Sequence, residues 1–153
     1  MQIVSRLVRC TVTVSCVLVV LASPAAAGGA RYFKDKKPNG SRIELRATPH
    51  RLLSGLFVAD RGTMKCDDGA IFVGGFPIES AKIVDERFRT VATDYFGEGG
   101  SWRLVIRGAL RGATIRGAVS LRFVNGDAEG RQECWSGRSK GDPLIRYVAR
   151  AGG

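Results

Sequence analysis

Alternating side chains over residues 102–123 constrain the fold of this chain more than any other feature. Apolar residues and glycine occupy every second position in two runs, 102–110 and 115–123, and the arginine–glycine pair at 111–112 can turn the chain between them. Alternation of this length around a glycine turn predicts a β-hairpin. The side expected to enter the core consists of Trp102, Leu104, Ile106, Gly108, Leu110, Ile115, Gly117, Val119, Leu121 and Phe123.

Two glycines, Gly108 and Gly117, lie on the core-facing side of this hairpin. Glycine inside a strand weakens it, because it offers no side chain to pack. The positions therefore predict that another backbone, or a bulky side chain such as that of Trp102, approaches the hairpin closely there.

Short alternating runs separated by glycine-containing turns cover the rest of the chain, which predicts further strands at 42–46, 55–60, 63–66, 70–73, 87–92, 132–135 and 145–149. In segment 79–91, Val84, Phe88 and Val91 have the spacing of a helix face. A turn at Asp85-Glu86 followed by a strand is favoured, because the neighbouring segments are strands. About eight short strands predict an all-β protein, an antiparallel β-sandwich or small barrel.

The first 27 residues have the order of a secretory signal peptide. Arg6 and Arg9 precede an apolar run at 11–22, and Ala25 and Ala27 form the expected cleavage motif. The apolar run is shorter than the ~20 residues that cross a membrane, so no transmembrane segment is expected after cleavage. Two alternatives remain, an uncleaved N-terminal anchor and a lipid on Cys16.

The remaining chain has the length of one domain. Residues 28–41 are polar, basic and rich in turn-forming residues, which predicts a flexible lead-in without a strand of its own. Residues 42–153 are then expected to form a single β-sandwich domain.

Cys66 and Cys134 are the two cysteines that remain after the leader. Export to an oxidising compartment favours a disulfide between them. The rival interpretations, two free thiols or a metal pair, lack the further cysteine or histidine ligands that a zinc site needs. No metal and no cofactor is therefore expected.

Several short motifs occur in a familiar order between about residues 60 and 150. They are Cys66-Asp67-Asp68-Gly69, the segments 83–88 and 108–117, Cys134-Trp135-Ser136-Gly137, and a closing Tyr147-Val148-Ala149. In this order the chain resembles largely uncharacterised small secreted β-sandwich proteins of high-GC Gram-positive bacteria. It departs from that group in ending on tyrosine where the group tends to have tryptophan, and in its 95–101 loop. The resemblance implies a fold and an envelope location, and it transfers no active site.

Residues suited to catalysis are sparse. His50 is the single histidine and lies in a turn-like context after Pro49, and no Gly-x-Ser-x-Gly motif accompanies it. Paired carboxylates can hydrolyse glycosides without histidine. The candidates, all in turn-like polar contexts, are Asp67, Asp68, Asp85, Glu86, Asp94 and Glu98.

The segment Asn125-Gly126-Asp127-Ala128-Glu129 places oxygen-bearing side chains at alternate positions. Calcium accepts such ligands, but an EF-hand loop needs more of them and a distal glutamate in register. The segment is therefore interpreted as a polar β-turn.

The chain is basic, with 24 lysines and arginines against 14 acidic residues and a net charge of +10. Arg103, Arg107, Arg116 and Arg122 alternate with the core side of the hairpin, so they are expected to share its outer face. Four guanidinium groups on one face are suited to phosphate or carboxylate. The alternative is that exposed strands carry charge for solubility and against edge pairing.

These observations predict a secreted or extracytoplasmic structural or binding module of the cell envelope that contacts an anionic cell-wall or surface polymer. Nucleic acid is an unlikely partner, because stacking aromatics are not interleaved on the predicted face. Two alternatives of different class remain, a carboxylate-dependent enzyme acting on glycan and a protein–protein interaction module that uses an exposed strand edge.

Overall fold

The computed structural model describes residues 28–38, 40–70, 72–97, 99–126 and 130–152. The predicted leader, with its cleavage motif at Ala25 and Ala27, lies outside these residues, as does most of the predicted turn at 125–129. The described residues form eleven strands and no helix, so the all-β antiparallel prediction is confirmed. The strands are β1 (Arg31–Lys36), β2 (Arg42–Thr48), β3 (Arg51–Ala59), β4 (Met64–Cys66), β5 (Gly74–Ile78), β6 (Ala81–Lys82), β7 (Arg87–Phe96), β8 (Gly100–Arg111), β9 (Thr114–Asn125), β10 (Gln132–Ser136) and β11 (Leu144–Ala151).

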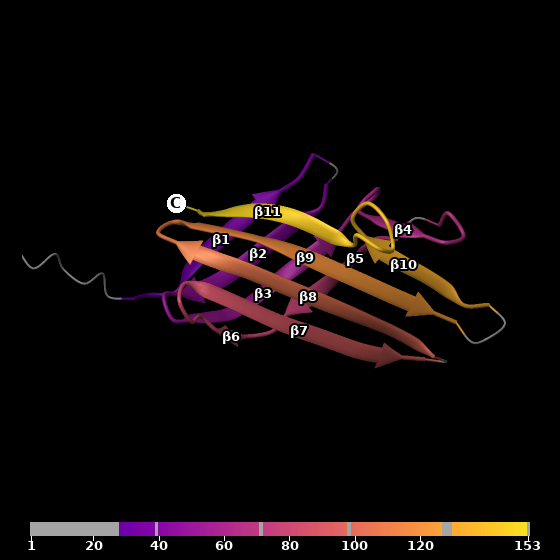
Figure 1. The fold of residues 1–153 in the computed structure, drawn as a ribbon, viewed down its shortest axis with the longest axis horizontal. Helices are drawn as coiled ribbons and strands as arrows, with labels where there is room; N and C mark the ends of the chain where they lie inside the picture. Colours follow the sequence, from indigo (N-terminus) through magenta and orange to yellow (C-terminus); the bar gives the residue numbers. More distant parts are fainter. Residues whose placement is uncertain (1–27, 39, 71, 98, 127–129, 153) are drawn as a thin grey trace, which may run out of the picture.

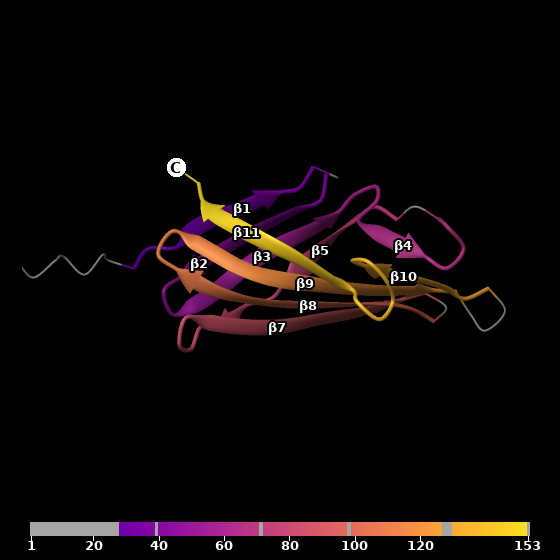
Figure 2. The ribbon, with the colours of Figure 1, turned by 45° about the horizontal axis from the view of Figure 1, so that its top comes forward.

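The first layer is built around the predicted hairpin. β8 and β9 pair along their whole length from Arg111↔Thr114 to Ser101↔Val124, and β7 pairs with the other edge of β8. The second edge of β9 is shared, because β10 pairs with its C-terminal part and β11 with its N-terminal part. Figures 1 and 2 show the long strands β7, β8 and β9 lying side by side.

The second layer contains β1, β2, β3 and β5, paired in that order. β11 connects the two layers, since it pairs with β9 and also, at Phe33↔Ala151, with β1. The strands of the two layers cross at a steep angle (Figure 1). The inward side chains of both layers form one core, whose largest fully buried members are Phe33, Phe57, Leu45, Leu52, Leu104, Ile106, Ile115 and Leu121.

The segment 28–41 differs from its prediction. It contains β1, which pairs with β2 from Arg31↔Ala47 to Lys36↔Arg42, so the expectation of a lead-in without a strand is wrong. Phe33 provides the reason, because its side chain is completely buried while most of its neighbours are charged and exposed. One buried aromatic residue and backbone pairing on two sides are enough to order a strand that composition alone does not predict.

The strand prediction for 70–73 is wrong, because the described residues of that segment are not in a strand and β5 (Gly74–Ile78) begins after it. Phe76 and Ile78 alternate into the core, and Phe76 lies opposite Phe57 of β3. The Gly74-Gly75 pair, although typical of a turn, starts the strand. Its backbone pairs with β3 at Ala59 and Val58.

The turn predicted at Asp85-Glu86 is confirmed. Both residues have positive φ, 48° and 62°, and Val84 and Arg87 bridge across them. Two positive φ values characterise the type I′ turn, whose twist matches antiparallel strands. The strand that follows, β7, runs beyond the predicted end at residue 92 as far as Phe96.

The close approach predicted at Gly108 and Gly117 occurs, but its partner is Tyr147 of β11. The two glycines lie opposite each other, and Gly117 lies opposite Tyr147. The Tyr147 hydroxyl lies over both glycines and donates a hydrogen bond of 3.1 Å to the Arg107 carbonyl, and burial raises the pKa of that hydroxyl. Trp102 packs elsewhere, with its ring 5.3 Å from that of Phe76. The sequence could not distinguish these partners, because Tyr147 comes from a strand thirty residues away.

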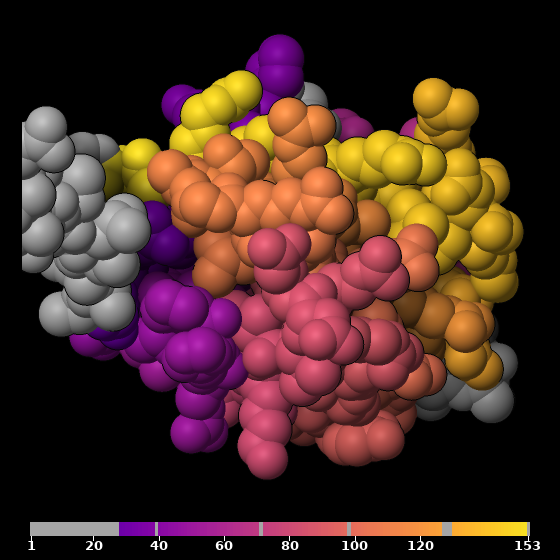
Figure 3. Space-filling view, turned by 60° about the vertical axis from the view of Figure 1, so that its left-hand side comes forward, coloured from indigo at the N-terminus to yellow at the C-terminus, as the bar shows by residue number. Residues whose placement is uncertain are grey.

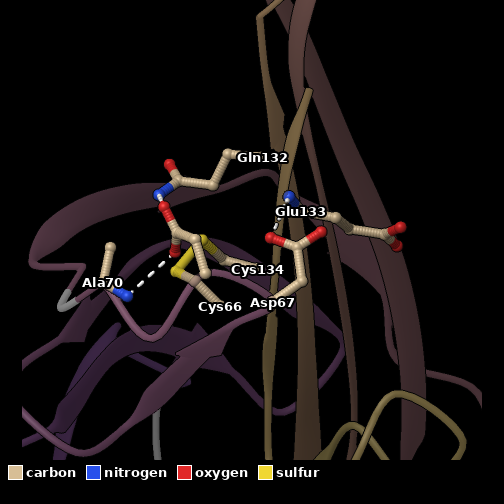
Figure 4. Close-up of a disulfide and its surroundings, with 7 residues drawn as sticks. Cys66, Asp67, Ala70, Gln132, Glu133 and Cys134 are labelled. Atoms are coloured by element: carbon tan, nitrogen blue, oxygen red, sulfur yellow. Dashed lines mark hydrogen bonds between the residues drawn. A yellow bond between two sulfur atoms is a disulfide. The ribbon is translucent and has the colours of Figure 1, made fainter. Parts of the chain in front are cut away.

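The predicted disulfide is present between Cys66 of β4 and Cys134 of β10 (Figure 4). The two residues are direct cross-strand partners, 68 positions apart in the sequence. Next to the disulfide, the Asp67 amide donates to the Glu133 carbonyl and an Asp67 carboxylate oxygen accepts from the Glu133 amide, at 3.0 and 3.1 Å. The bridge therefore holds β4 against β10, at one edge of the first layer.

Replacing Cys66 and Cys134 together by serine should lower the free energy of unfolding by about 4 kcal/mol, because the unfolded chain then loses a long covalent loop. Urea unfolding of the full chain, monitored by circular dichroism, measures the difference. An unchanged unfolding midpoint in the double variant would contradict the stabilising role of the bridge.

Gly117→Ala should lower the free energy of unfolding by about 1–3 kcal/mol, because overpacking forces neighbouring groups apart. A Cβ there would lie 2.5 Å from the Tyr147 hydroxyl oxygen and would also collide with the Arg107 carbonyl. Gly141→Ala is the matched control, since its Cβ would meet no atom within 4 Å. Equal urea midpoints for the two variants would show that the close approach does not matter.

Candidate functional site

Nine arginines point outward from four adjacent strands. Arg111 and Arg150 flank Thr114 at one end of the sheet, and the other seven form what we call the arginine face. Alternation along each strand places them on the side of the first layer that faces away from the core, and all seven are exposed. Figure 3 shows the surface on which segments of β7 (salmon), the β8–β9 hairpin (orange) and β11 (yellow) meet. The members of the arginine face are Arg87, Arg89, Arg103, Arg107, Arg116, Arg122 and Arg146.

The strand register places several of these cations directly opposite one another. Arg103 lies opposite Arg122 across β8 and β9, and Arg89 lies opposite Arg107 across β7 and β8. Directly opposed like charges on one face of a sheet are destabilising. The arrangement therefore costs stability, whereas a face selected only for solubility would interleave both signs.

Carboxylates compensate little of this charge. Among the described residues, Arg122 is the one member of the arginine face that forms a salt bridge, and its partner is Glu133. Arg111, at the end of β8, pairs with Glu86 at 3.3 Å. The face therefore keeps a strongly positive potential that attracts anions from solution.

Glu133 of β10 is the buried acidic residue beside this face. Its carboxylate accepts from Arg122 Nε at 2.5 Å and from Lys140 Nζ at 2.6 Å. Burial acts to raise the pKa of Glu133, but the hydrogen bonds and charges of Arg122 and Lys140 outweigh it, and the net pKa is lowered. A carboxyl group held ionised in this way cannot serve as a general acid at neutral pH. Its role is to position the two cations.

A shallow hollow of about 580 Å³ lies in the arginine face. Guanidinium groups line it together with small hairpin residues such as Ala109 and Ala118 and with the apolar side chains of Leu144 and Val148. The arginines come from all four strands, and they are Arg87, Arg107, Arg116 and Arg146. Several planar donors around one depression suit a phosphate or carboxylate group, which guanidinium binds through two parallel hydrogen bonds.

A second hollow, of about 330 Å³, adjoins the first further along β8 and β9. Its charged groups are Arg103 and the network of Arg122, Glu133 and Lys140. Its remaining lining includes Trp135 of β10, which lies opposite Arg122. This hollow thus combines an aromatic ring with free and paired charges.

The structure brings all four predicted arginines, Arg103, Arg107, Arg116 and Arg122, onto one outer face. Sequence reasoning missed the remaining contributions, which are Arg87, Arg89, Arg146, Glu133 and Trp135. A signal was present for the last two. Cys134 must point inward to meet Cys66, so its neighbours on a strand must point outward.

Of the candidate catalytic residues, His50, Asp85 and Glu86 line one shallow hollow of about 320 Å³, whereas Asp67, Asp68 and Asp94 lie elsewhere. His50 lies in the β2–β3 turn, as predicted, and its carbonyl accepts a hydrogen bond from the Ile83 amide. Asp68 accepts from the Ala70 amide and from the Gln132 side chain, and these two bonds lower its pKa. Such contacts hold a loop in place.

Asp67 accepts a hydrogen bond from the Glu133 amide, and Glu86 forms a salt bridge with Arg111. Asp94 accepts from the amide of the next residue, Tyr95. The Glu133 side chain extends away from Asp67 and the disulfide (Figure 4). Glu98 lies outside the described residues. Within the described ranges, no group of three histidine, cysteine or acidic residues is placed to hold a metal ion.

Comparison with protein-family models, with curated proteins and with solved structures found no match for this chain. The part of the chain that the structure describes contains no helix with the length and apolarity to cross a membrane.

Arg103→Gln should raise the free energy of unfolding at low ionic strength by about 0.2–1 kcal/mol, because it removes a cation directly opposite Arg122. Added salt should reduce the gain, since exposed charges are screened. Arg61→Gln, in the β3–β4 turn, is a control with the same charge change. Urea unfolding at two salt concentrations measures both effects, and a destabilised Arg103→Gln protein would contradict the repulsion.

Proposed function

We propose that this protein is a binding module that holds an anionic polymer of the cell envelope on its arginine face. The observation that carries the proposal is the direct opposition of Arg103 with Arg122 and of Arg89 with Arg107. A bound chain of phosphates or carboxylates would neutralise this repulsion, which costs stability in the unbound protein.

The geometry of the face favours a polymer over a single small anion. Its arginines extend over four strands, and two adjoining hollows lie between them. Arg103 and Arg107 are four residues apart on one strand, a separation of about 13 Å at the usual rise per residue. Anionic groups repeated along one chain could contact both, and each additional contact adds to the affinity.

The disulfide supports an extracytoplasmic location for this binding. Bridges of this kind persist in oxidising compartments and are rare in the cytosol. A basic module outside the membrane would meet wall and surface polymers that carry phosphate or carboxylate groups. The proposal therefore assigns the protein to the secreted or envelope fraction.

A binding assay on defined polymers tests the proposed function. The full chain should bind polyphosphate and polygalacturonate and should not bind neutral dextran, and its affinity should fall as salt rises, because binding releases condensed counterions. The double variant Arg103→Gln/Arg107→Gln should bind both polymers at least tenfold more weakly. Fluorescence anisotropy with labelled polymer at several salt concentrations gives these values.

The matched control is Arg46→Gln/Arg61→Gln, which removes the same charge from β2 and from the β3–β4 turn. Its affinity should stay within about twofold of the parent, since neither residue belongs to the arginine face. Equal losses in the two double variants would show that net charge alone attracts the polymer. That result would refute the assignment of the site.

A further inference from the structure

We propose that the second hollow is a sugar subsite built on Trp135, so that the polymer held by the arginine face is an anionic polysaccharide. This inference rests on the proposed function and adds the chemical class of the ligand. The argument starts from the difference between the residues that line the two hollows. The charged groups that line the first are all arginines, whereas the second has a partly exposed indole ring and a hydrogen-bonded network of Arg122, Glu133 and Lys140.

Trp135 is held in position from both sides. Its backbone pairs with Arg122 of β9 and with Lys65 of β4, and the disulfide at Cys134 fixes the adjacent residue. The ring is partly exposed, on the outer side of the sheet. Its indole nitrogen is buried and has no hydrogen-bond partner among the described residues, which is rare for a buried donor. An aromatic ring fixed beside cations is preorganised to receive a ligand.

A sugar ring has an apolar C–H face and polar hydroxyl groups, and the other groups that line this hollow suit both. Val105 and Pro143 provide apolar contact, as the indole face does, for the C–H side of a ring. Ser120 and the Glu133–Lys140 pair provide acceptors and donors for hydroxyl groups. Arg103 forms no salt bridge among the described residues and is available for the carboxylate or phosphate of the same sugar unit.

The two hollows lie next to each other on one sheet face. Val105 and Ser120, opposite each other, line the second hollow, and Arg107 and Ala118, two residues along, line the first. Two residues of strand correspond to about 7 Å, so consecutive parts of one chain can occupy both hollows. A ligand with several sugar units should therefore bind much more tightly than a single sugar.

Single-stranded nucleic acid also combines negative charge with rings that stack on aromatic side chains. Proteins that bind it stack successive bases on several aromatic residues along a basic groove. In the two hollows described here, Trp135 is the one aromatic ring that lies on the outer face, because Phe88 and Tyr147 are buried on the core side. A single partly exposed ring, Trp135, among many guanidinium groups suits an anionic polysaccharide, in which one sugar ring stacks while the other units contribute charge.

Tryptophan fluorescence of the full chain gives a direct test. The chain contains two tryptophans, Trp102 against the core and Trp135 on the outer face. Oligogalacturonate and hyaluronan oligosaccharides should change the emission of the parent and of Trp102→Phe. The change should be lost in Trp135→Leu. Polyphosphate should bind with a much smaller change, because it has no sugar ring.

Affinities separate the sugar subsite from the arginine face. Trp135→Leu should lose about tenfold in affinity for the oligosaccharides, as expected for one lost stacking contact, and should keep its affinity for polyphosphate within twofold. Trp135→Phe retains a ring and should keep most of the oligosaccharide affinity, which guards against a folding defect in the leucine variant. Galacturonic acid monomer should bind at least a hundredfold more weakly than the oligomer.

The outcomes distinguish the two proposals. If the parent binds neither oligosaccharide nor polyphosphate, the proposed function fails. If both bind and Trp135→Leu loses nothing, the arginine face stands and the sugar subsite is refuted. If Trp135 contributes to binding of single-stranded oligothymidylate and not of either oligosaccharide, the subsite accepts bases, and the assignment to polysaccharide is overturned.

Discussion

The pairing of β9 with two successive strands along one edge sets the position of most other elements. β10 covers the end of β9 near Phe123, and β11 covers the end near Ile115. Between them the Leu121 amide donates to the buried Ser136 hydroxyl, which itself donates to the Pro143 carbonyl. The Leu121 amide, at the point where β9 changes its partner from β10 to β11, is therefore hydrogen-bonded and not left unpaired in the core. Because β11 pairs with β1 as well as with β9, it joins the two layers.

The arrangement of β10 links stability to the candidate site. Cys134 points inward and is bonded to Cys66, so Glu133 and Trp135 must point outward from a strand that is covalently anchored. Glu133 then orders Arg122 and Lys140, and Trp135 is presented beside Arg103. A disulfide that resists unfolding thereby also fixes the geometry of the second hollow. The disulfide stabilises the fold and so offsets part of the repulsion between the opposed arginines.

The features that could be predicted from the sequence were those encoded in short-range alternation. The faces of β8 and β9 follow from a period of two, and with them the outward positions of Arg103, Arg107, Arg116 and Arg122. The features that could not be predicted depend on which strands become neighbours. Phe33 orders β1 only because β2 and β11 pair on either side of it. Tyr147 covers Gly117 because β11 lies beside β9, and Arg87, Arg89 and Arg146 join the face for the same kind of reason.

Repulsion on the arginine face couples folding to binding. In the free protein the opposed arginines lower the stability of the fold, and this cost is largest when little salt screens them. An anion that binds between them removes the cost, so it stabilises the folded state by more than its contacts alone would provide. Salt ions relieve the same repulsion without occupying a defined position. They therefore stabilise the free protein while weakening the polymer complex, and the two effects of salt have opposite signs because they arise from one set of charges.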